Sequence, residues 1–150
     1  MLVNTFSSQD DLQISEACVQ AIVETVIHLE HQTCDEVSIY FVNTEEICQL
    51  HDEFFEDPSP TDCISFPMDC ELDETPYLVL GEVFVCPATA IEYAKREKVD
   101  PYEETTLYII HGLLHLMGYE DLEEEDIVKM REAESRHLHH IKKLNLVLKP

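Results

Sequence analysis

The order of apolar and polar residues predicts alternating strands and helices in the first third of the chain. Residues 1–6 predict a short strand, and the β-branched and aromatic run at 37–42 predicts a second one. Between them, Ser8 and Asp11 resemble a helix-capping pair, and apolar residues then recur at helical spacing over 12–30. This part of the chain therefore predicts a strand–helix–strand unit.

The middle of the chain predicts one further helix and two further strands. Asn43 or Thr44 can cap a helix that runs through to Phe54. Strands are predicted at 63–66 and 77–86, and an acidic loop at 69–76 separates them. Both strands are apolar enough to join the strands of the first third in one sheet.

Three helices are predicted in the last third of the chain. The first begins at Pro87, where proline suits the first helical position. Asp100 and Pro101 are a strong start signal for the second, which is apolar nearly all round and ends at Gly118. The third covers 122–140 and is amphipathic. A helix that is apolar on all sides needs protein around it, so we expect the second helix to be central and buried.

These elements predict an α/β (α+β) fold, with a small mixed sheet covered by helices and a central buried helix. A chain of 150 residues can build one core, so we expect a single domain over residues 1–150. Gly81, inside the last predicted strand, indicates a bulge or a close approach. The sequence shows no run of 18 apolar residues, no secretory signal and no CxxC among its six cysteines. It therefore favours a cytoplasmic protein with buried free thiols.

The charge of the chain is strongly acidic and uneven. The formal net charge is −23, and residues 1–94 carry 20 acidic residues and no lysine or arginine. Residues 95–150 carry 9 basic and 12 acidic residues. Composition alone therefore argues against a nucleic-acid-binding protein, which needs a basic surface, and favours a solvated acidic surface.

The segment HGLLHLMGYED, residues 111–121, carries the candidate chemistry. His111 and His115 are four residues apart, so one helix face directs both imidazoles toward one point, as in HExxH metal sites. Gly118 permits a chain reversal that can bring Asp121 back toward them. Two histidines and a carboxylate can hold one zinc ion, or another divalent transition metal, and leave a position open for water. Such an ion makes a nucleophile from its water near neutral pH.

Structural roles remain open for the same residues. His111 and His115 can be core histidines that bond to backbone or carboxylate groups. Asp121 and Glu124 can also cap the last helix, and that role does not exclude metal binding. Position 112 is glycine, where HExxH peptidases carry their general-base glutamate, so peptidase chemistry of that type lacks its base.

Other histidines and tyrosines have structural interpretations. His137, His139 and His140 lie near the C-terminal end of the last helix, which we expect to be exposed, and cationic side chains there suit the helix dipole. Tyr108 and Tyr119 are interpreted as packing residues with a polar handle, and a supporting role at the site stays open for them.

Three blocks of the sequence resemble those of a known family. HGLLHLMGYED is similar to the HGxLHLxGYDH signature of the YbeY-type rRNA maturation factors. TDCISFP at 61–67 is similar to that family's TDVLSFP segment, and LGEVFV at 80–85 is similar to its LGDIxI strand. The order and spacing of the blocks, together with the chain length, make the resemblance cover most of the chain.

The resemblance implies a metal-dependent, single-strand-specific endoribonuclease that acts in ribosomal RNA 3′ end maturation and ribosome quality control. It implies a zinc-type ion and an α/β fold with a metal groove, in which Thr61, Asp62 and Ser65 form one wall and the strand of Glu82 another. Ribosomal RNA, the small ribosomal subunit and ribosomal proteins are the implied partners, in the cytoplasm. We expect a monomer.

Two positions depart from the family's pattern. Asp121 stands where the family has its third histidine; a carboxylate is an acceptable zinc ligand, but its charge would make the bound water less acidic. Phe55 stands where the family has an arginine, and no basic residue precedes Lys95. If the family's arginine contacts phosphate, this chain lacks the contact or takes a basic residue from its second half. The candidates there are Lys95, Arg96, Lys98, Lys129, Arg131, Arg136, Lys142 and Lys143.

These departures leave three alternatives to RNA cleavage. The first is a catalytically weak or inactive ribosome-binding assembly factor of the same family, because an acidic surface suits basic ribosomal proteins. The second, a zinc peptidase, is disfavoured by Gly112. The third is a purely structural acidic domain, and metal analysis distinguishes it from the others.

Overall fold

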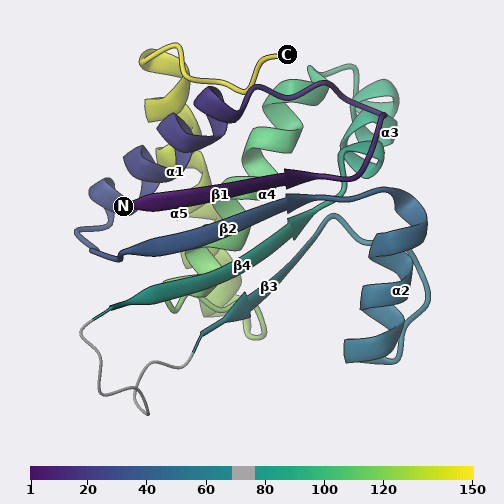
Figure 1. The fold of residues 1–150 in the computed structure, drawn as a ribbon, viewed down its shortest axis with the longest axis horizontal. Helices are drawn as coiled ribbons and strands as arrows, with labels where there is room; N and C mark the ends of the chain where they lie inside the picture. Colours follow the sequence, from purple (N-terminus) through teal and green to yellow (C-terminus); the bar gives the residue numbers. More distant parts are fainter. Residues whose placement is uncertain (69–76) are drawn as a thin grey trace.

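The computed structural model describes residues 1–68 and 77–150, so the acidic loop predicted at 69–76 lies outside the described residues. Over these ranges strands and helices alternate as far as α2, two successive strands follow, and three helices complete the chain (Figure 1). The elements are β1 (Leu2–Ser7), α1 (Glu16–Leu29), β2 (Glu36–Phe41), α2 (Thr44–Phe55), β3 (Cys63–Pro67), β4 (Val79–Val85), α3 (Pro87–Glu97), α4 (Pro101–Leu116) and α5 (Glu124–Lys143).

The strands form one mixed sheet in the order β1-β2-β4-β3. β1 and β4 run parallel to β2, and β3 is antiparallel to β4. Parallel neighbours need a crossover connection, which α1 supplies between β1 and β2. Figure 1 shows α1, α4 and α5 behind the sheet, and α2 beside its right-hand end. The predicted α/β class, with a small mixed sheet covered by helices, is confirmed.

Helix α4 lies at the centre of the helical layer, as its apolar sequence predicts. It packs against β3 and β4 of the sheet and against α1, α3 and α5. Burial of the helix on all these sides fixes its position, and with it the position of every polar side chain that it carries. Its buried residues are Thr105, Thr106, Tyr108, Ile109, Ile110, Gly112, Leu113, Leu114 and Leu116.

Side-chain hydrogen bonds set the starts of three helices. Asp100 caps α4, as predicted, and Asn43, one of the two predicted candidates, caps α2; both accept from backbone N–H groups of the first turn. The predicted start of α1 near Ser8 is wrong, because the Ser8 hydroxyl donates to the Glu46 carboxylate instead. The N-cap of α1 is Ser15, so the helix begins later than its apolar pattern indicates.

Gly81 forms the bulge predicted in β4. Two steps along β2, from Glu36 to Ser38, correspond to three steps along β4. The φ angle of Gly81 is 150°, and a Cβ there would lie 2.5 Å from the backbone oxygen of Phe66. A side chain at this position would collide with β3, so the bulge requires glycine.

The remaining predictions about the fold are met in part. α5 extends beyond its predicted range of 122–140, to Lys143. No helix of the described ranges is long and apolar enough to cross a membrane. The described cysteines are free thiols, but Cys86 is the buried one among them and the others are half-buried. Cys70 lies outside the described residues.

Candidate metal centre

His111 and His115 extend from one face of α4, near its C-terminal end. Their Nε2 atoms are 3.0 Å apart, and their rings meet edge to face with centroids 4.5 Å apart. Their side chains are 18% and 27% exposed, although most of the helix is buried. The two imidazoles therefore converge as the four-residue spacing predicts, and they do so where solvent reaches them.

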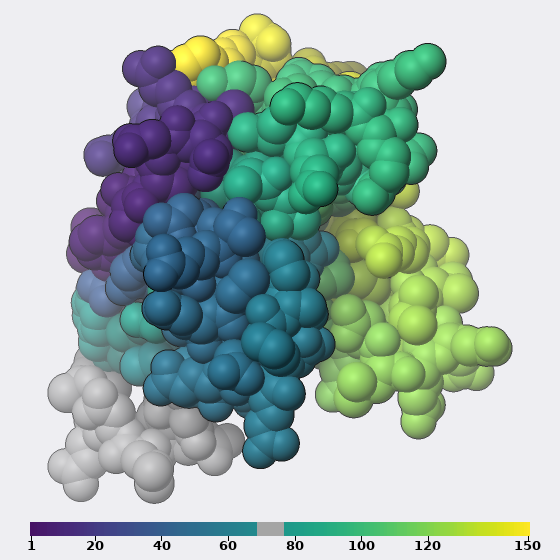
Figure 2. All heavy atoms as spheres, turned by 90° about the vertical axis from the view of Figure 1, so that its right-hand side faces the viewer, coloured from purple at the N-terminus to yellow at the C-terminus, as the bar shows by residue number. Residues whose placement is uncertain are grey.

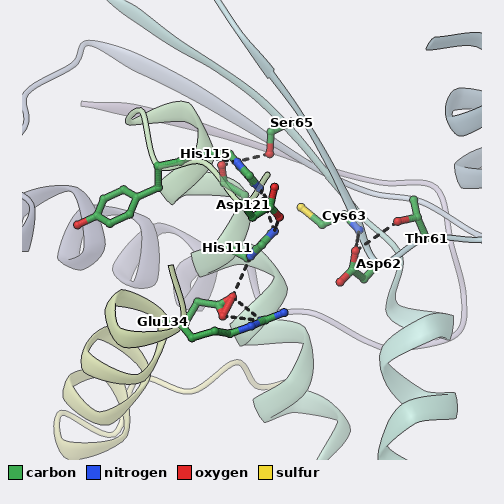
Figure 3. Close-up of polar contacts among 11 residues, drawn as sticks. Thr61, Asp62, Cys63, Ser65, His111, His115, Asp121 and Glu134 are labelled. Carbon is green, nitrogen blue, oxygen red and sulfur yellow. Dashed lines mark hydrogen bonds and ion pairs between the residues drawn. The ribbon is translucent and has the colours of Figure 1, made fainter. Parts of the chain in front are cut away.

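The chain reverses after α4 and brings a carboxylate to the two histidines. Gly118 has a φ of 101°, a backbone conformation that glycine adopts at little cost. Asp121 then lies with Oδ2 3.4 Å from His115 Nε2 and 3.7 Å from His111 Nε2. The three ligand atoms all lie within 4.8 Å of one another. Figure 3 shows the three side chains pointing toward one another.

The other ring nitrogens of the two histidines face hydrogen-bond acceptors. His111 Nδ1 is 2.9 Å from Glu134 Oε1, and His115 Nδ1 is 2.9 Å from the carbonyl oxygen of Tyr119. A carbonyl and a carboxylate can only accept, so each Nδ1 carries a proton and donates. In the neutral imidazoles, each Nε2 then presents a lone pair toward the other.

Two lone pairs 3.0 Å apart beside a carboxylate oxygen repel one another unless positive charge lies among them. This donor set fits a divalent cation, because imidazole nitrogen and carboxylate oxygen are the ligands that zinc takes. Hydrogen bonds from the second ring nitrogen to a carboxylate or a backbone carbonyl are the usual support of metal-binding histidines. Within the described residues, no other group of three or more histidine, cysteine, aspartate or glutamate side chains lies close enough together to hold an ion.

Glu134 of α5 is the buried partner of His111, with a side chain only 4% exposed. Burial raises the pKa of Glu134, but hydrogen bonds and charge from His111 and Arg131 outweigh burial and lower the pKa. Arg131 Nη1 donates to both carboxylate oxygens, at 3.0 and 2.9 Å. Glu134 therefore remains an anion near neutral pH, which strengthens the His111 imidazole as a ligand.

Asp121 does not take the alternative role of a helix cap. The N-cap of α5 is Glu123, and no side chain accepts from the backbone there. The Asp121 side chain is 42% exposed, and its carboxylate faces the two histidines. Its carboxylate is thus available as a third ligand.

A groove of about 500 Å³ lies beside the two histidines. In Figure 2 it lies between the blue surface that includes α2 and the yellow-green surface of the segment after α4. Thr61, Asp62 and Ser65 are among the residues that line it (Figure 3). Glu82 does not reach it: this residue lies beside Tyr40, on the other face of the sheet. Successive residues of a strand point to opposite faces of the sheet. The neighbours of Glu82 in β4 face the helices, so the Glu82 side chain points away from the helices and from the groove.

Phe55 also lines the groove, and its side chain is 57% exposed. No lysine or arginine occurs among the described residues that line the groove, which include Asp62, Glu120 and Asp121. The lining of the groove therefore carries carboxylates and aromatic rings, and its described residues offer no lysine or arginine to a phosphate.

Gly112, between the two histidines in sequence, packs closely against the sheet. A Cβ at this position would lie 2.4 Å from Val83 Cγ1 and 2.9 Å from Cys63 Sγ. Ser65 Oγ donates to the Gly112 carbonyl at 3.1 Å. The glutamate of HExxH peptidases does not fit here, so packing explains the absence of that base.

Cys63 lines the groove as a thiol rather than a thiolate. Burial raises the pKa of the Cys63 thiol strongly, and the charge of Asp62 raises it further. A protonated thiol is a poor metal ligand and a poor nucleophile. The candidate ligand set is therefore His111, His115 and Asp121.

The interpretation of the later histidines as exposed end-of-helix residues is wrong for His137. Its side chain is 0% exposed, and its Nε2 lies 2.8 Å from Glu30 Oε2. Tyr119 donates its hydroxyl to the other oxygen of the same carboxylate at 2.6 Å. Glu30 thus connects α5 to the loop that carries Asp121. His139 is exposed, as expected.

Two supporting residues are missing from the predicted site, Glu134 and Glu30. A signal exists for the first, because α5 buries a stripe that contains a carboxylate and a histidine among apolar residues. Charged residues on a buried helix face need partners. Glu30 follows the last residue of α1 and gives no such signal. Tyr108 is a buried core residue, as expected.

Comparison with known proteins gives a consistent result. A family model described as "Endoribonuclease YbeY" matches residues 4–142. The Endoribonuclease YbeY of Protochlamydia amoebophila is 60% identical over 149 residues, which cover 99% of each chain. That of Chlamydia trachomatis serovar D is 36% identical over 146 residues, which cover 96% of this chain and 90% of the relative. A solution structure from Thermotoga maritima shares the fold, with a TM-score of 0.64 and 24% identity over 93% of this chain and 89% of that one. The chain therefore belongs to the YbeY endoribonuclease family.

Proposed function

We propose that this chain is a metal-dependent, single-strand-specific endoribonuclease that acts in ribosomal RNA 3′ end maturation and ribosome quality control. Membership in the family makes it a hydrolase of the endoribonuclease type. The convergence of two Nε2 lone pairs and a carboxylate oxygen beside an open groove supports metal dependence. The nitrogen and oxygen donors favour one zinc ion, and another divalent transition metal would fit the same ligands.

The groups of the protein hold and orient the reacting components. When bound, the ion supplies Lewis-acid catalysis and a hydrolytic nucleophile near neutral pH. Glu134 and the Tyr119 carbonyl fix the rings of His111 and His115. Because Ser65 donates its hydroxyl hydrogen to Gly112, its oxygen can only accept from a bound nucleotide. A ribose 2′-hydroxyl is a group that can donate to it.

The deciding experiment compares wild-type protein with the His115→Ala variant, both supplied with zinc. We expect the wild type to cleave single-stranded RNA, to leave double-stranded RNA intact and to lose activity with a chelator. The variant should not cleave, and its zinc content should fall. Identical behaviour of the two proteins would overturn the proposal.

A second candidate is a ribosome-binding assembly factor that does not cleave. The acidic and aromatic groove with Phe55 favours it, because a phosphodiester there meets carboxylates and no cation. If this candidate holds, we expect the protein to co-sediment with small ribosomal subunits. The His111→Ala/His115→Ala variant should co-sediment equally well. A peptidase is not supported, because no glutamate fits at Gly112.

We propose ribosomal RNA, the small ribosomal subunit and ribosomal proteins as partners, for a monomer in the cytoplasm. The acidic surface supports contact with basic ribosomal proteins. Nζ of Lys142 lies 3.2 Å from Oε1 of Glu103, so part of the lysine's charge is already compensated within the protein. Size-exclusion chromatography and cell fractionation test the oligomeric state and the location.

A further inference from the structure

The groove beside the metal ligands continues into a second hollow on the other side of His111. This hollow lies among α3, α4 and α5, and it shares Asp62, His111 and Asp121 with the groove. Its wall includes Arg131, which is the one lysine or arginine among the described residues that line either space. A phosphodiester lying across the ligands therefore has one basic side chain close by.

Arg131 is anchored at one end and open at the other. Its Nη1 donates to both oxygens of Glu134, and Glu134 Oε1 is 2.9 Å from His111 Nδ1. Two successive hydrogen bonds thus connect the guanidinium to a ligand ring. Glu134 is 4% exposed and Arg131 is 69% exposed. Neither bond to Glu134 uses Nη2 or Nε, so these donors remain available for a ligand.

The remaining charges of the second hollow are negative and lie close to one another. Burial raises the pKa of Glu104, and the charges of Asp62, Glu103 and Glu134 raise it further. These carboxylates repel an RNA phosphate wherever it approaches, except beside Arg131 and the metal ligands. The charges therefore restrict where a phosphate can lie.

We propose that Arg131 binds an RNA phosphate next to the metal ligands and makes the hollow among α3, α4 and α5 a nucleotide subsite. The inference rests on the proposed function, since it needs RNA at the site. The guanidinium suits this task because its fork of N–H groups matches phosphate oxygens. Anchoring by Glu134 reduces the freedom that the side chain loses on binding. Arg131 of α5 then supplies the cation, whereas the first half of the chain has Phe55 at the position of the family's arginine.

Binding of a fluorescein-labelled single-stranded RNA to the full chain, with chelator present, tests the subsite without cleavage. The variants are Arg131→Met, Arg131→Lys and the control Lys149→Met, which changes an exposed cation that lines neither space. We expect Arg131→Met to bind about tenfold more weakly. Its plot of log affinity against log salt should be shallower by about 0.7, the effect of one lost phosphate contact. Arg131→Lys should keep most of the slope, and the control should keep all of it.

Zinc affinity, measured by competition with a coloured chelator, separates this role from a purely structural one. If Arg131 only holds Glu134, Arg131→Met loses zinc affinity and keeps the wild-type salt slope, which overturns the proposal. If the wild type cleaves RNA and Arg131→Met keeps the wild-type salt slope, the proposed subsite is refuted and the proposed nuclease function is not. A reduced slope in a protein that never cleaves supports the subsite and refutes the nuclease. Absence of RNA binding by the wild type refutes both.

Discussion

Within residues 1–68 and 77–150, the histidine–carboxylate cluster at the groove and the one on the buried face of α5 differ in what the histidine nitrogens face. At the groove, His111 and His115 donate through Nδ1 and present both Nε2 lone pairs to one point beside Asp121. On the buried face of α5, Nε2 of His137 contacts the Glu30 carboxylate, and Nδ1 of His137 is buried without a partner among the described residues. The same residue types form a candidate ligand set in one place and a buried structural pair in the other.

The difference shows that residue type and spacing do not by themselves define a metal site. Convergence of free lone pairs and access to solvent distinguish the first cluster, whose histidines are 18% and 27% exposed. His137 is 0% exposed, and burial lowers its pKa despite the nearby Glu30 carboxylate. The second cluster therefore holds elements together, and the first can bind a ligand.

The largest expected effect comes from removing a ligand at the groove. His111→Ala should lower zinc affinity by more than about 100-fold, the upper range for changes in supporting residues. His137→Ala should leave zinc affinity within a few-fold, although it destabilises the fold. Isothermal titration or chelator competition measures both. Equal losses in the two variants would erase the distinction between the clusters.

The next largest effect is expected at the carboxylate that supports His111. Glu134→Gln keeps the size of the side chain and removes its charge, so zinc affinity should fall about 10- to 100-fold. Glu132→Gln is the matched control, because Glu132 is exposed on the same helix. Wild-type affinity in Glu134→Gln would show that the Nδ1 hydrogen bond does not tune the ligand.

Glu30→Ala tests the buried pair through stability. The substitution leaves Nε2 of His137 and the Tyr119 hydroxyl without their acceptor. We expect a loss of about 2–4 kcal/mol in the free energy of unfolding, measured with urea. Glu24→Ala, an exposed change in α1, should cost well under 1 kcal/mol by comparison. Similar losses in both variants would mean that the pair adds no stability.

The smallest effect is a dependence of stability on pH that belongs to the buried pair. The pKa of His137 is lowered from 6.5, chiefly by burial. Burial raises the pKa of Glu30, but hydrogen bonds from Tyr119 and His137 outweigh it and lower the pKa from 4.5. In both cases the unfolded chain takes up protons at higher pH than the folded chain. The stability that this pair contributes is therefore fully present above pH 6.5. It declines as the pH falls, first through the protonation of His137 and, below pH 4.5, through that of Glu30.

Urea titrations of metal-free protein at a series of pH values measure this decline. His137→Gln removes the first titrating group, so its stability should change less between neutral pH and about pH 5.5. A decline as steep as that of the wild type would assign the acid sensitivity to other groups.

Much of the fold follows from local sequence signals. The apolar residues of α4 predict its central position, and Asn43 and Asp100 identify two helix starts. The start of α1 is missed because Ser8 has the chemistry of a cap, but Glu46 of a distant element captures its hydroxyl. Tertiary contacts of this kind leave no trace in the local pattern.

The candidate site divides in the same way. The histidine spacing and Gly118 bring the three ligand atoms together, so that part is visible in the sequence. The contact of His137 with Glu30 joins residues 107 positions apart, and no periodicity relates them. Glu82 is misplaced because its face of the sheet depends on the register that the Gly81 bulge sets.

The contact of Gly112 with the sheet also limits what this fold can become. A designer who wished to convert the site to peptide hydrolysis would add a glutamate there, and the atoms of Val83 and Cys63 already occupy that volume. Room for it appears only if α4 moves away from β3 and β4, which breaks the Ser65 hydrogen bond and opens the wall of the groove. The space that a base would need and the space that shapes the substrate groove are the same, so the chain can have one or the other.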